Sequence, residues 1–150
     1  MTGTGSSRPL ADGAPKQPAV LFLCVHNAGR SQMAAGWLRH LAGDTVDVYS
    51  GGSDPGPAIN PAAVAAMAEV GIDIADRVPR RWTEETARAA DVIVTMGCGD
   101  ACPVSPDRRH EDWQLTDPAG RPLDVVRGVR DEIEQHVRAL LVSLGTGDPA

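Results

Sequence analysis

The sequence predicts an α/β fold in which strands and helices alternate along a single chain. Apolar segments at 19–24, 46–50 and 91–95 predict strands, and each is followed by a segment with helical spacing of apolar residues. This alternation is typical of a parallel, doubly wound sheet with right-handed crossovers. At 150 residues the chain has the length of one domain with one core, and no internal repeat indicates a second.

The first half of the chain predicts two strands around a helix. Residues 19–24 (AVLFLC) are continuously apolar, as expected of a parallel strand covered on both faces. After a short loop a helix begins near Ser31, and Gly43 is placed to end it in the left-handed conformation. Residues 46–50 (VDVYS) predict the second strand.

The second half predicts three helices and one strand. Asn60 and Pro61 mark the N-cap and first turn of a helix that Gly71 ends. Thr83 caps a short helix before the strand at 91–95. The last helix spans about 124–142, and its apolar stripe is Val126, Val129, Ile133, Val137, Leu140 and Leu141.

Composition excludes several classes of protein. The formal net charge is −6 and the arginines are scattered, so no basic stripe for nucleic acid or anionic membrane is present. The longest apolar run, 19–25, is far shorter than the roughly 20 residues of a membrane helix. Residues 1–18 lack the apolar segment of a signal peptide, and we interpret them as a disordered tail.

The same evidence sets the expected organisation and location. We expect one domain at 19–144 and a short C-terminal tail at 145–150. An odd count of three cysteines argues against a secreted disulfide framework and favours a cytoplasmic protein whose thiols are reduced, metal-bound or chemically active. No amphipathic seam remains once the sheet is covered, which favours a monomer.

The loop between the first strand and first helix carries the main chemical signal. It is the segment Cys24, Val25, His26, Asn27, Ala28, Gly29, Arg30 and Ser31. Backbone N–H groups, the positive end of the helix and the Arg30 guanidinium can together cradle a tetrahedral oxyanion. The same field favours the Cys24 thiolate, a nucleophile placed beneath the central atom of the anion. Ser31 can hydrogen-bond the sulfur, and Asn27 can hold the loop shape.

A simpler interpretation remains open for this loop. Cys24 could be a small buried residue at a strand end and Arg30 a solvated helix charge. His26 could add charge to the loop or point to solvent. We favour the chemical interpretation because the Cys-x5-Arg spacing lies at the junction of strand and helix that the mechanism needs.

Asp117 is the candidate acid. It begins the sequence Asp117-Pro118-Ala119-Gly120, a stiff loop whose carboxyl group could protonate a departing oxygen. An ordinary turn explains the same four residues on conformational grounds alone.

Cys98 and Cys102 are the candidate redox pair. Cys24 and Cys98 each follow a parallel strand, so both thiols should emerge at the carboxyl edge of the sheet. In one helical turn Cys98 and Cys102 would have Cα atoms about 6 Å apart, within disulfide range. They could instead be inert or bind zinc with His110, which leaves a tetrahedral site one ligand short.

Several ordered motifs resemble one known family. Segments 24–34, 94–103, 111–113 and 117–120 are similar to the arsenate reductases built on the low-molecular-weight tyrosine phosphatase fold. The resemblance covers about 19–144. It implies a single-domain three-layer sandwich with a four-stranded parallel sheet, and it implies no bound cofactor.

The resemblance also implies roles for the site residues. Cys24 attacks arsenate, Arg30 binds its oxygens and Asp117 assists proton transfer. Cys98 then attacks the sulfur of the Cys24 adduct, arsenite is released, and Cys102 resolves the disulfide. The external reductant is a thioredoxin-like protein, although some relatives use a low-molecular-weight thiol.

Two departures from the family pattern bear on these implications. Only three residues separate Cys98 from Cys102, fewer than in some relatives. Relatives that bind potassium have carboxylates where this chain has Ala35 and Arg80, so we expect no metal site. The alternatives are a low-molecular-weight protein tyrosine phosphatase, disfavoured because Ala119 and Gly120 provide no aromatic wall, and a non-enzymatic thiol sensor of metal or arsenic.

Overall fold

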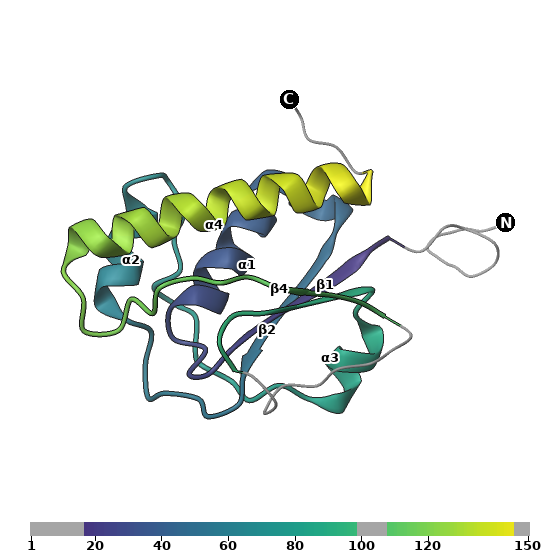
Figure 1. The fold of residues 1–150 in the computed structure, drawn as a ribbon, viewed down its shortest axis with the longest axis horizontal. Coiled ribbons are helices and arrows are strands. Elements are labelled where there is room, and N and C mark those ends of the chain that lie inside the picture. The colour runs from purple at the N-terminus through teal and green to yellow at the C-terminus, as the bar shows by residue number, and fades with distance from the viewer. Residues whose placement is uncertain (1–16, 99–107, 146–150) are drawn as a thin grey trace, which may run out of the picture.

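Four parallel strands form one sheet in the order β2-β1-β3-β4 in the computed structural model, which describes residues 17–98 and 108–145 (Figure 1). The strands are β1 (Ala19–Cys24), β2 (Asp47–Gly52), β3 (Val92–Thr95) and β4 (Arg109–Asp112). In the register of β1, Cys24 lies opposite Gly52 and Leu23 opposite Thr95. The predicted parallel α/β fold is confirmed.

The helices cover the two faces of the sheet unequally. Among the described residues, one face carries α1 (Arg30–Ala42), α2 (Pro61–Ala68) and α4 (Leu123–Leu144), and the other carries α3 (Glu84–Ala89) alone (Figure 1). The 3-10 turn η1 (Gly43–Thr45) joins α1 to β2. The result is the expected three-layer sandwich, with one thick helical layer and one thin one.

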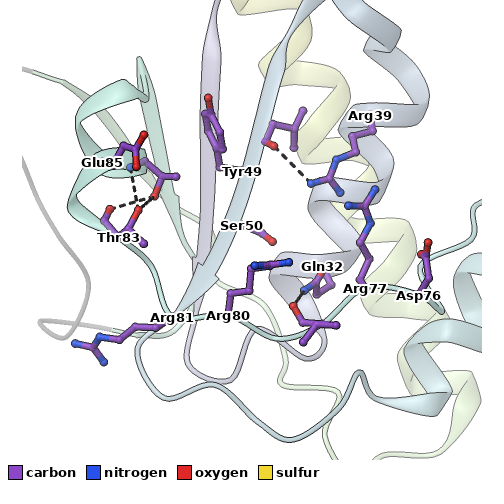
Figure 2. A pocket seen from close by; sticks show the side chains of 13 residues that line it. Gln32, Arg39, Tyr49, Ser50, Asp76, Arg77, Arg80, Arg81, Thr83 and Glu85 are labelled. Atoms are coloured by element: carbon purple, nitrogen blue, oxygen red, sulfur yellow. Dashed lines mark hydrogen bonds between the residues drawn. The ribbon is translucent and has the colours of Figure 1, made fainter.

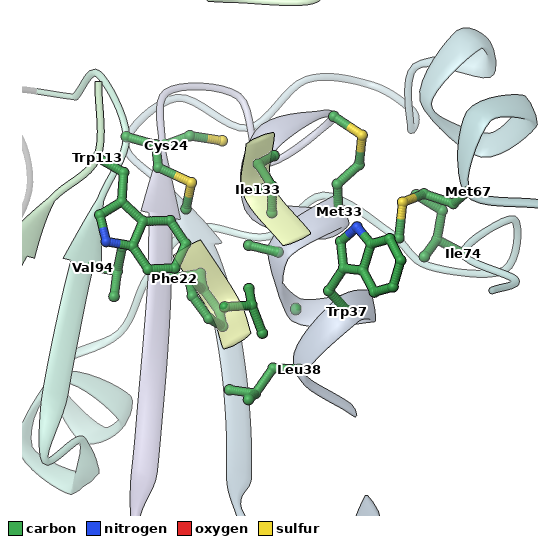
Figure 3. Packing of buried hydrophobic residues seen from close by; sticks show 14 of the residues in the cluster. Phe22, Cys24, Met33, Trp37, Leu38, Met67, Ile74, Val94, Trp113 and Ile133 are labelled. Carbon is green, nitrogen blue, oxygen red and sulfur yellow. The ribbon is translucent and has the colours of Figure 1, made fainter. Parts of the chain in front are cut away.

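Alternate residues of β1 build two separate hydrophobic clusters. Phe22 and Cys24 face the larger cluster, where Phe22 packs against Trp113 with ring centroids 5.7 Å apart (Figure 3). Leu21 and Leu23 face the smaller cluster under α3. The stripe predicted for the last helix is buried in the larger cluster at Val126, Val129, Ile133, Val137, Leu140 and Leu141.

Local capping signals are confirmed, although the ends of two helices differ from expectation. The Asn60 side chain accepts the Ala62 N–H at 2.9 Å, and Thr83 caps α3 in the same way. Helix α2 ends at Ala68, before Gly71, because a tight turn intervenes. The prediction of a left-handed cap at Gly43 is wrong, since its φ of 60° and ψ of −128° lead the chain into η1.

Strand β4 was not found by sequence reasoning from periodicity. Its residues, Arg109 to Asp112, are all polar and mostly exposed. An edge strand with polar side chains lacks the apolar signal that marks a buried strand. Only pairing with β3, with Val92 opposite Arg109, reveals it.

No helix within 17–98 and 108–145 is long and apolar enough to cross a membrane. The expected tails at 1–18 and 145–150 lie almost entirely outside the described residues, and Cys102 lies outside them as well.

Candidate active site

The predicted loop lies at the carboxyl edge of the sheet, between β1 and α1. Cys24 is the last residue of β1, is 2% exposed and is a free thiol. Arg30 is the first residue of α1 and is also buried. The chain therefore brings the thiol, the loop amides and the guanidinium to one place, as the sequence predicts.

The loop carbonyls are turned away from the thiol by a second segment, 53–60. The carbonyl oxygens of Cys24, Val25, His26 and Ala28 accept the N–H groups of Ser53, Asp54, Gly56 and Asn60 at 3.2, 2.8, 2.9 and 2.8 Å. In a trans peptide the next N–H points opposite to the carbonyl. The amides that follow these four carbonyls therefore face the opposite side of the loop, which is the arrangement of an anion cradle.

The positive end of α1 opens toward the same cavity. Its N-cap is Gly29, which supplies no side chain to cap the first turn, and that turn holds no acidic residue. Unpaired amides and the helix dipole therefore favour a negative charge there. Arg30 adds a full charge, and its guanidinium packs over Gly97, where a Cβ would lie 2.8 Å from Arg30 Nη1.

Ser31 is positioned to donate a hydrogen bond to the thiol. Its Oγ lies 2.9 Å from Cys24 Sγ and accepts the Nδ2–H of Asn27 at 2.7 Å. Because Asn27 Nδ2 can only donate, the Ser31 hydroxyl proton is left for the sulfur. This contact fixes the position of the Cys24 sulfur, as a candidate nucleophile requires.

Asn27 ties the loop to the rest of the fold. It is fully buried and has a positive φ of 51°, a conformation that asparagine tolerates better than most residues. Its Oδ1 accepts Gln32 Nε2 at 3.0 Å and the Arg80 N–H at 2.9 Å. Sequence reasoning assigned Asn27 to loop shape but gave Gln32 and Arg80 no part in holding it, because these contacts depend on how separate segments pack.

Asp117 lies beside the guanidinium, on the loop before α4. Its Oδ2 is 3.6 Å from Arg30 Nη2, and its side chain is 55% exposed. Its Oδ1 accepts the Ala119 N–H at 3.0 Å, which orients the carboxyl group. Asn60 holds the same loop by donating to the Pro118 carbonyl at 3.4 Å.

A cavity of about 40 Å³ lies among these groups, lined by Cys24, His26, Ala28, Gly29, Arg30, Asn60, Asp117, Pro118 and Ala119. Its volume is that of a few water-sized groups, which suits a small ion. The thiol, the cation and the carboxyl group all line it. The candidate nucleophile, anion ligand and acid thus line one cavity.

Two glycines close this site, although sequence reasoning gave neither of them a part in it. A Cβ on Gly52 would lie 2.6 Å from the Val25 carbonyl oxygen, so only glycine lets the loop pack on the end of β2. Gly97, with φ of 95°, plays the same part under Arg30. The available signal was the Gly51-Gly52 pair at the end of a predicted strand.

Of the remaining candidates among the described residues, only His26 lines this cavity. Cys98 follows β3 at the same edge and is 8% exposed, within the smaller hydrophobic cluster. His26 is exposed, and its Nδ1 lies 2.9 Å from the Asp54 carbonyl oxygen. His110 contacts Thr95 Oγ1 at 3.1 Å. Within 17–98 and 108–145, no group of three or more His, Cys, Asp or Glu side chains could hold a metal ion.

Comparisons with known proteins agree on one family. Residues 19–148 match the model of the family described as low molecular weight phosphotyrosine protein phosphatase. Arsenate reductase 2 of Staphylococcus haemolyticus is 40% identical over 124 residues, which are 80% of this chain and 93% of that protein.

Two solved structures have the same fold. A thioredoxin-dependent arsenate reductase of Corynebacterium glutamicum superposes with a TM-score of 0.74 at 40% identity, covering 86% of this chain and 62% of that one. An arginine phosphatase of Geobacillus stearothermophilus superposes with a TM-score of 0.75 at 27% identity, covering 86% and 94%.

Proposed function

Because the chain belongs to the low molecular weight phosphotyrosine protein phosphatase family, we propose that it uses the cradle after β1 to reduce arsenate to arsenite. The observation that carries the proposal is the free, buried Cys24 thiol in the floor of an oxyanion-sized cavity. The 40% identity to a curated arsenate reductase favours arsenate over other tetrahedral anions. In a cell this activity would serve arsenic detoxification.

The first step is nucleophilic attack on arsenic. The Cys24 thiolate forms an S–As bond, and one arsenate oxygen leaves as water after protonation by Asp117. The amides that follow the outward-turned carbonyls of Cys24, Val25, His26 and Ala28, together with Arg30, hold the remaining oxygens. They stabilise the charge that builds up on them. Arsenic keeps its oxidation state in this step.

The second step transfers the electrons. Cys98 as a thiolate attacks the Cys24 sulfur, the S–As electron pair moves to arsenic, and arsenite leaves. Two thiols have then been oxidised to a Cys24–Cys98 disulfide and arsenic has gained two electrons. Cys102 attacks Cys98 to release Cys24, and a thioredoxin-like dithiol reduces the Cys98–Cys102 disulfide. Placement of Cys24 and Cys98 at one sheet edge supports this order.

Three single variants test the proposal. Cys24→Ser should lose all arsenite formation, and Cys98→Ser should release no arsenite even from a single turnover. Cys102→Ser should release about one arsenite per enzyme and stop, because the Cys24–Cys98 disulfide is not resolved. Arsenite release is measured with a thioredoxin system, and disulfides are mapped by mass spectrometry of peptides. Sustained turnover by Cys98→Ser or Cys102→Ser would contradict the relay.

Phosphatase activity is the second candidate, favoured by the family match and by the structural likeness to an arginine phosphatase. A phosphocysteine mechanism needs Cys24, Arg30 and Asp117 but neither of the other cysteines. Hydrolysis of an aryl phosphate should therefore survive Cys98→Ser and Cys102→Ser. A wild-type protein that hydrolyses aryl phosphate rapidly and reduces no arsenate would replace the reductase proposal, and stoichiometric arsenite binding without turnover would favour the sensor.

Asp117→Asn tests the acid. We expect the rate of arsenite formation to fall about 100-fold, since a positioned acid contributes about that factor or more. The matched control is Asp44→Asn, an exposed carboxylate in η1 at the opposite edge of the sheet. Equal rates in the two variants would remove Asp117 from the mechanism.

A further inference from the structure

A second and much larger pocket lies beside β2, and the proposed reaction does not use it. Its volume is about 420 Å³, against about 40 Å³ for the cavity at Cys24. It opens along the outer edge of β2, between α1, the segment 76–81 and the start of α3. Its most frequent lining residue is arginine, at positions 39, 77, 80 and 81.

Three of these arginines converge on the pocket. Figure 2 shows the guanidinium groups of Arg39 and Arg77 side by side and that of Arg80 turned toward Gln32 and Ser50. Arg81 points away, where it donates to the Ser53 carbonyl at 2.8 Å and lies over the Trp82 ring. Arg39, Arg77 and Arg80 therefore define the arginine cluster of this pocket.

The arginine cluster lacks carboxylate partners among the described residues. None of the seven ion pairs within 17–98 and 108–145 includes Arg39, Arg77 or Arg80, although Asp76 and Glu85 lie in the pocket wall. Figure 2 shows Asp76 on the far side of Arg77 and Glu85 across β2. Burial of Arg39 and repulsion from Arg77 both lower the pKa of Arg39. Neighbouring like charges without a counter-ion are unfavourable and attract anions.

We propose that the arginine cluster binds the diphosphate group of a small anion, separately from the oxyanion cradle at Cys24. Three guanidinium groups match the several negative charges that two linked phosphoryl groups carry together at neutral pH. Arginine is suited to this because its planar fork donates to two oxygens at once. Ser50 lines the same pocket beside Arg80 and supplies a hydroxyl donor (Figure 2). The volume exceeds what a single tetrahedral ion requires.

The pocket shares two residues with the network that holds the nucleophile. Gln32 lines the pocket, and its side chain donates to Asn27 at 3.0 Å. Arg80 lines it as well, and its backbone N–H donates to the same Asn27 oxygen. An anion held by Arg80 would therefore restrain the segment that supports the loop of Cys24. Binding itself can be measured without turnover, so its failure would leave the reductase proposal untouched.

Titration of the full chain with sodium pyrophosphate, without magnesium and followed by calorimetry, tests the proposal. We expect one site in the wild type, weaker at higher salt. Arg77→Gln and Arg80→Gln, both at exposed positions, should each weaken binding about tenfold or more, as expected for a lost charged hydrogen bond. Arg88→Gln and Arg138→Gln, which remove exposed arginines paired with Glu84 and Glu134, should bind as the wild type does.

Arg30→Gln separates the two anion sites. If pyrophosphate binds at the arginine cluster, this variant keeps its affinity. Loss of binding in Arg30→Gln with retention in Arg77→Gln would place the ion at the Cys24 loop and overturn the proposal. The proposal would also be overturned if pyrophosphate did not bind to the wild type, or if Arg88→Gln weakened binding as much as Arg77→Gln does. ADP serves as a second titrant. Tighter binding of ADP than of pyrophosphate would indicate a nucleoside diphosphate as the ligand, and equal or weaker binding of ADP would indicate the diphosphate group alone.

Discussion

The two faces of the sheet hold the two described cysteines in different surroundings. Cys24 belongs to the large hydrophobic cluster that α1, α2 and α4 build on one face, and Figure 3 shows it near Trp113 and Ile133. Cys98 belongs to the small cluster under α3, a helix of six residues. Among the described residues, the two cysteines share one edge of the sheet but lie in hydrophobic clusters of different extent.

This difference fits the different tasks proposed for the two thiols. An anion cradle must hold its geometry to within a fraction of an ångström, so its nucleophile is best anchored in the most densely packed part of a domain. A relay thiol must approach another sulfur, and rearrangement costs least where few apolar contacts are lost. Among the described residues, a displacement of Cys98 would break fewer such contacts than a displacement of Cys24.

Matched truncations of one buried side chain in each hydrophobic cluster should cause the largest loss of unfolding free energy. Ile133 and Ile93 are both essentially fully buried, one in each cluster. We expect Ile133→Ala to cost about 4 kcal/mol of unfolding free energy and Ile93→Ala about 2 to 3 kcal/mol, because a thinner layer collapses more readily around the cavity. Urea unfolding under reducing conditions measures both. Equal costs would show that the two faces are equally rigid.

Substitution of Asn27, in the loop between β1 and α1, should cause a smaller loss of unfolding free energy. Asn27→Ala leaves the Arg80 N–H and the Gln32 amide without their acceptor, which should cost about 2 to 3 kcal/mol and slow alkylation of Cys24. Asn27→Gly relieves the positive φ and should recover at most about 1 kcal/mol of stability, but none of the alkylation rate. Full recovery by glycine would mean that only the backbone conformation matters.

The smallest effect concerns the contact between two helices of the thick layer. Glu69, directly after α2, accepts hydrogen bonds from Arg127 and Arg130 of α4 at 2.7 and 2.9 Å. The bond from Arg127 is the main reason that the pKa of Glu69 is lowered to about 2 from 4.5. A carboxyl pKa that folding lowers stabilises the fold above its unfolded value, and that contribution is lost as the pH falls from about 4.5 toward 2.

Glu69→Gln should therefore lower Tm slightly at pH 7 and flatten the fall of Tm between pH 5 and 2. The shift should be only about 1 to 3 °C, because the pair is partly exposed and screened by solvent. Glu132→Gln, an exposed carboxylate on α4, is the matched control. Parallel pH profiles for the wild type and Glu69→Gln would contradict a role for this contact.

Much of the fold followed from local patterns. Some features depend only on residues that are close together in the sequence, so they could be predicted without knowing what packs against them. They are the apolar run of β1, the apolar stripe of α4 and the caps at Asn60 and Thr83. Strand β4 could not, since its polar residues form a strand only by pairing with β3. The motif from Cys24 to Arg30 could be predicted for the same reason, because one short loop between β1 and α1 connects the candidate nucleophile Cys24 to the Arg30 cation.

The sequence by itself determined the order of elements, the anion loop and the edge of the sheet on which it lies, because periodicity and spacing are properties of short segments. Only the tertiary structure decided how the loop is held. The N–H groups of segment 53–60 bind the loop carbonyls, and Gly52 lacks the Cβ that would collide with the loop. Gln32 and Arg80 donate hydrogen bonds to Asn27 from separate segments. The arginine cluster is likewise a feature that only the tertiary structure decided. Arg39 and Arg77 are far apart along the chain, and only the packing of α1 beside the segment 76–81 brings their like charges together.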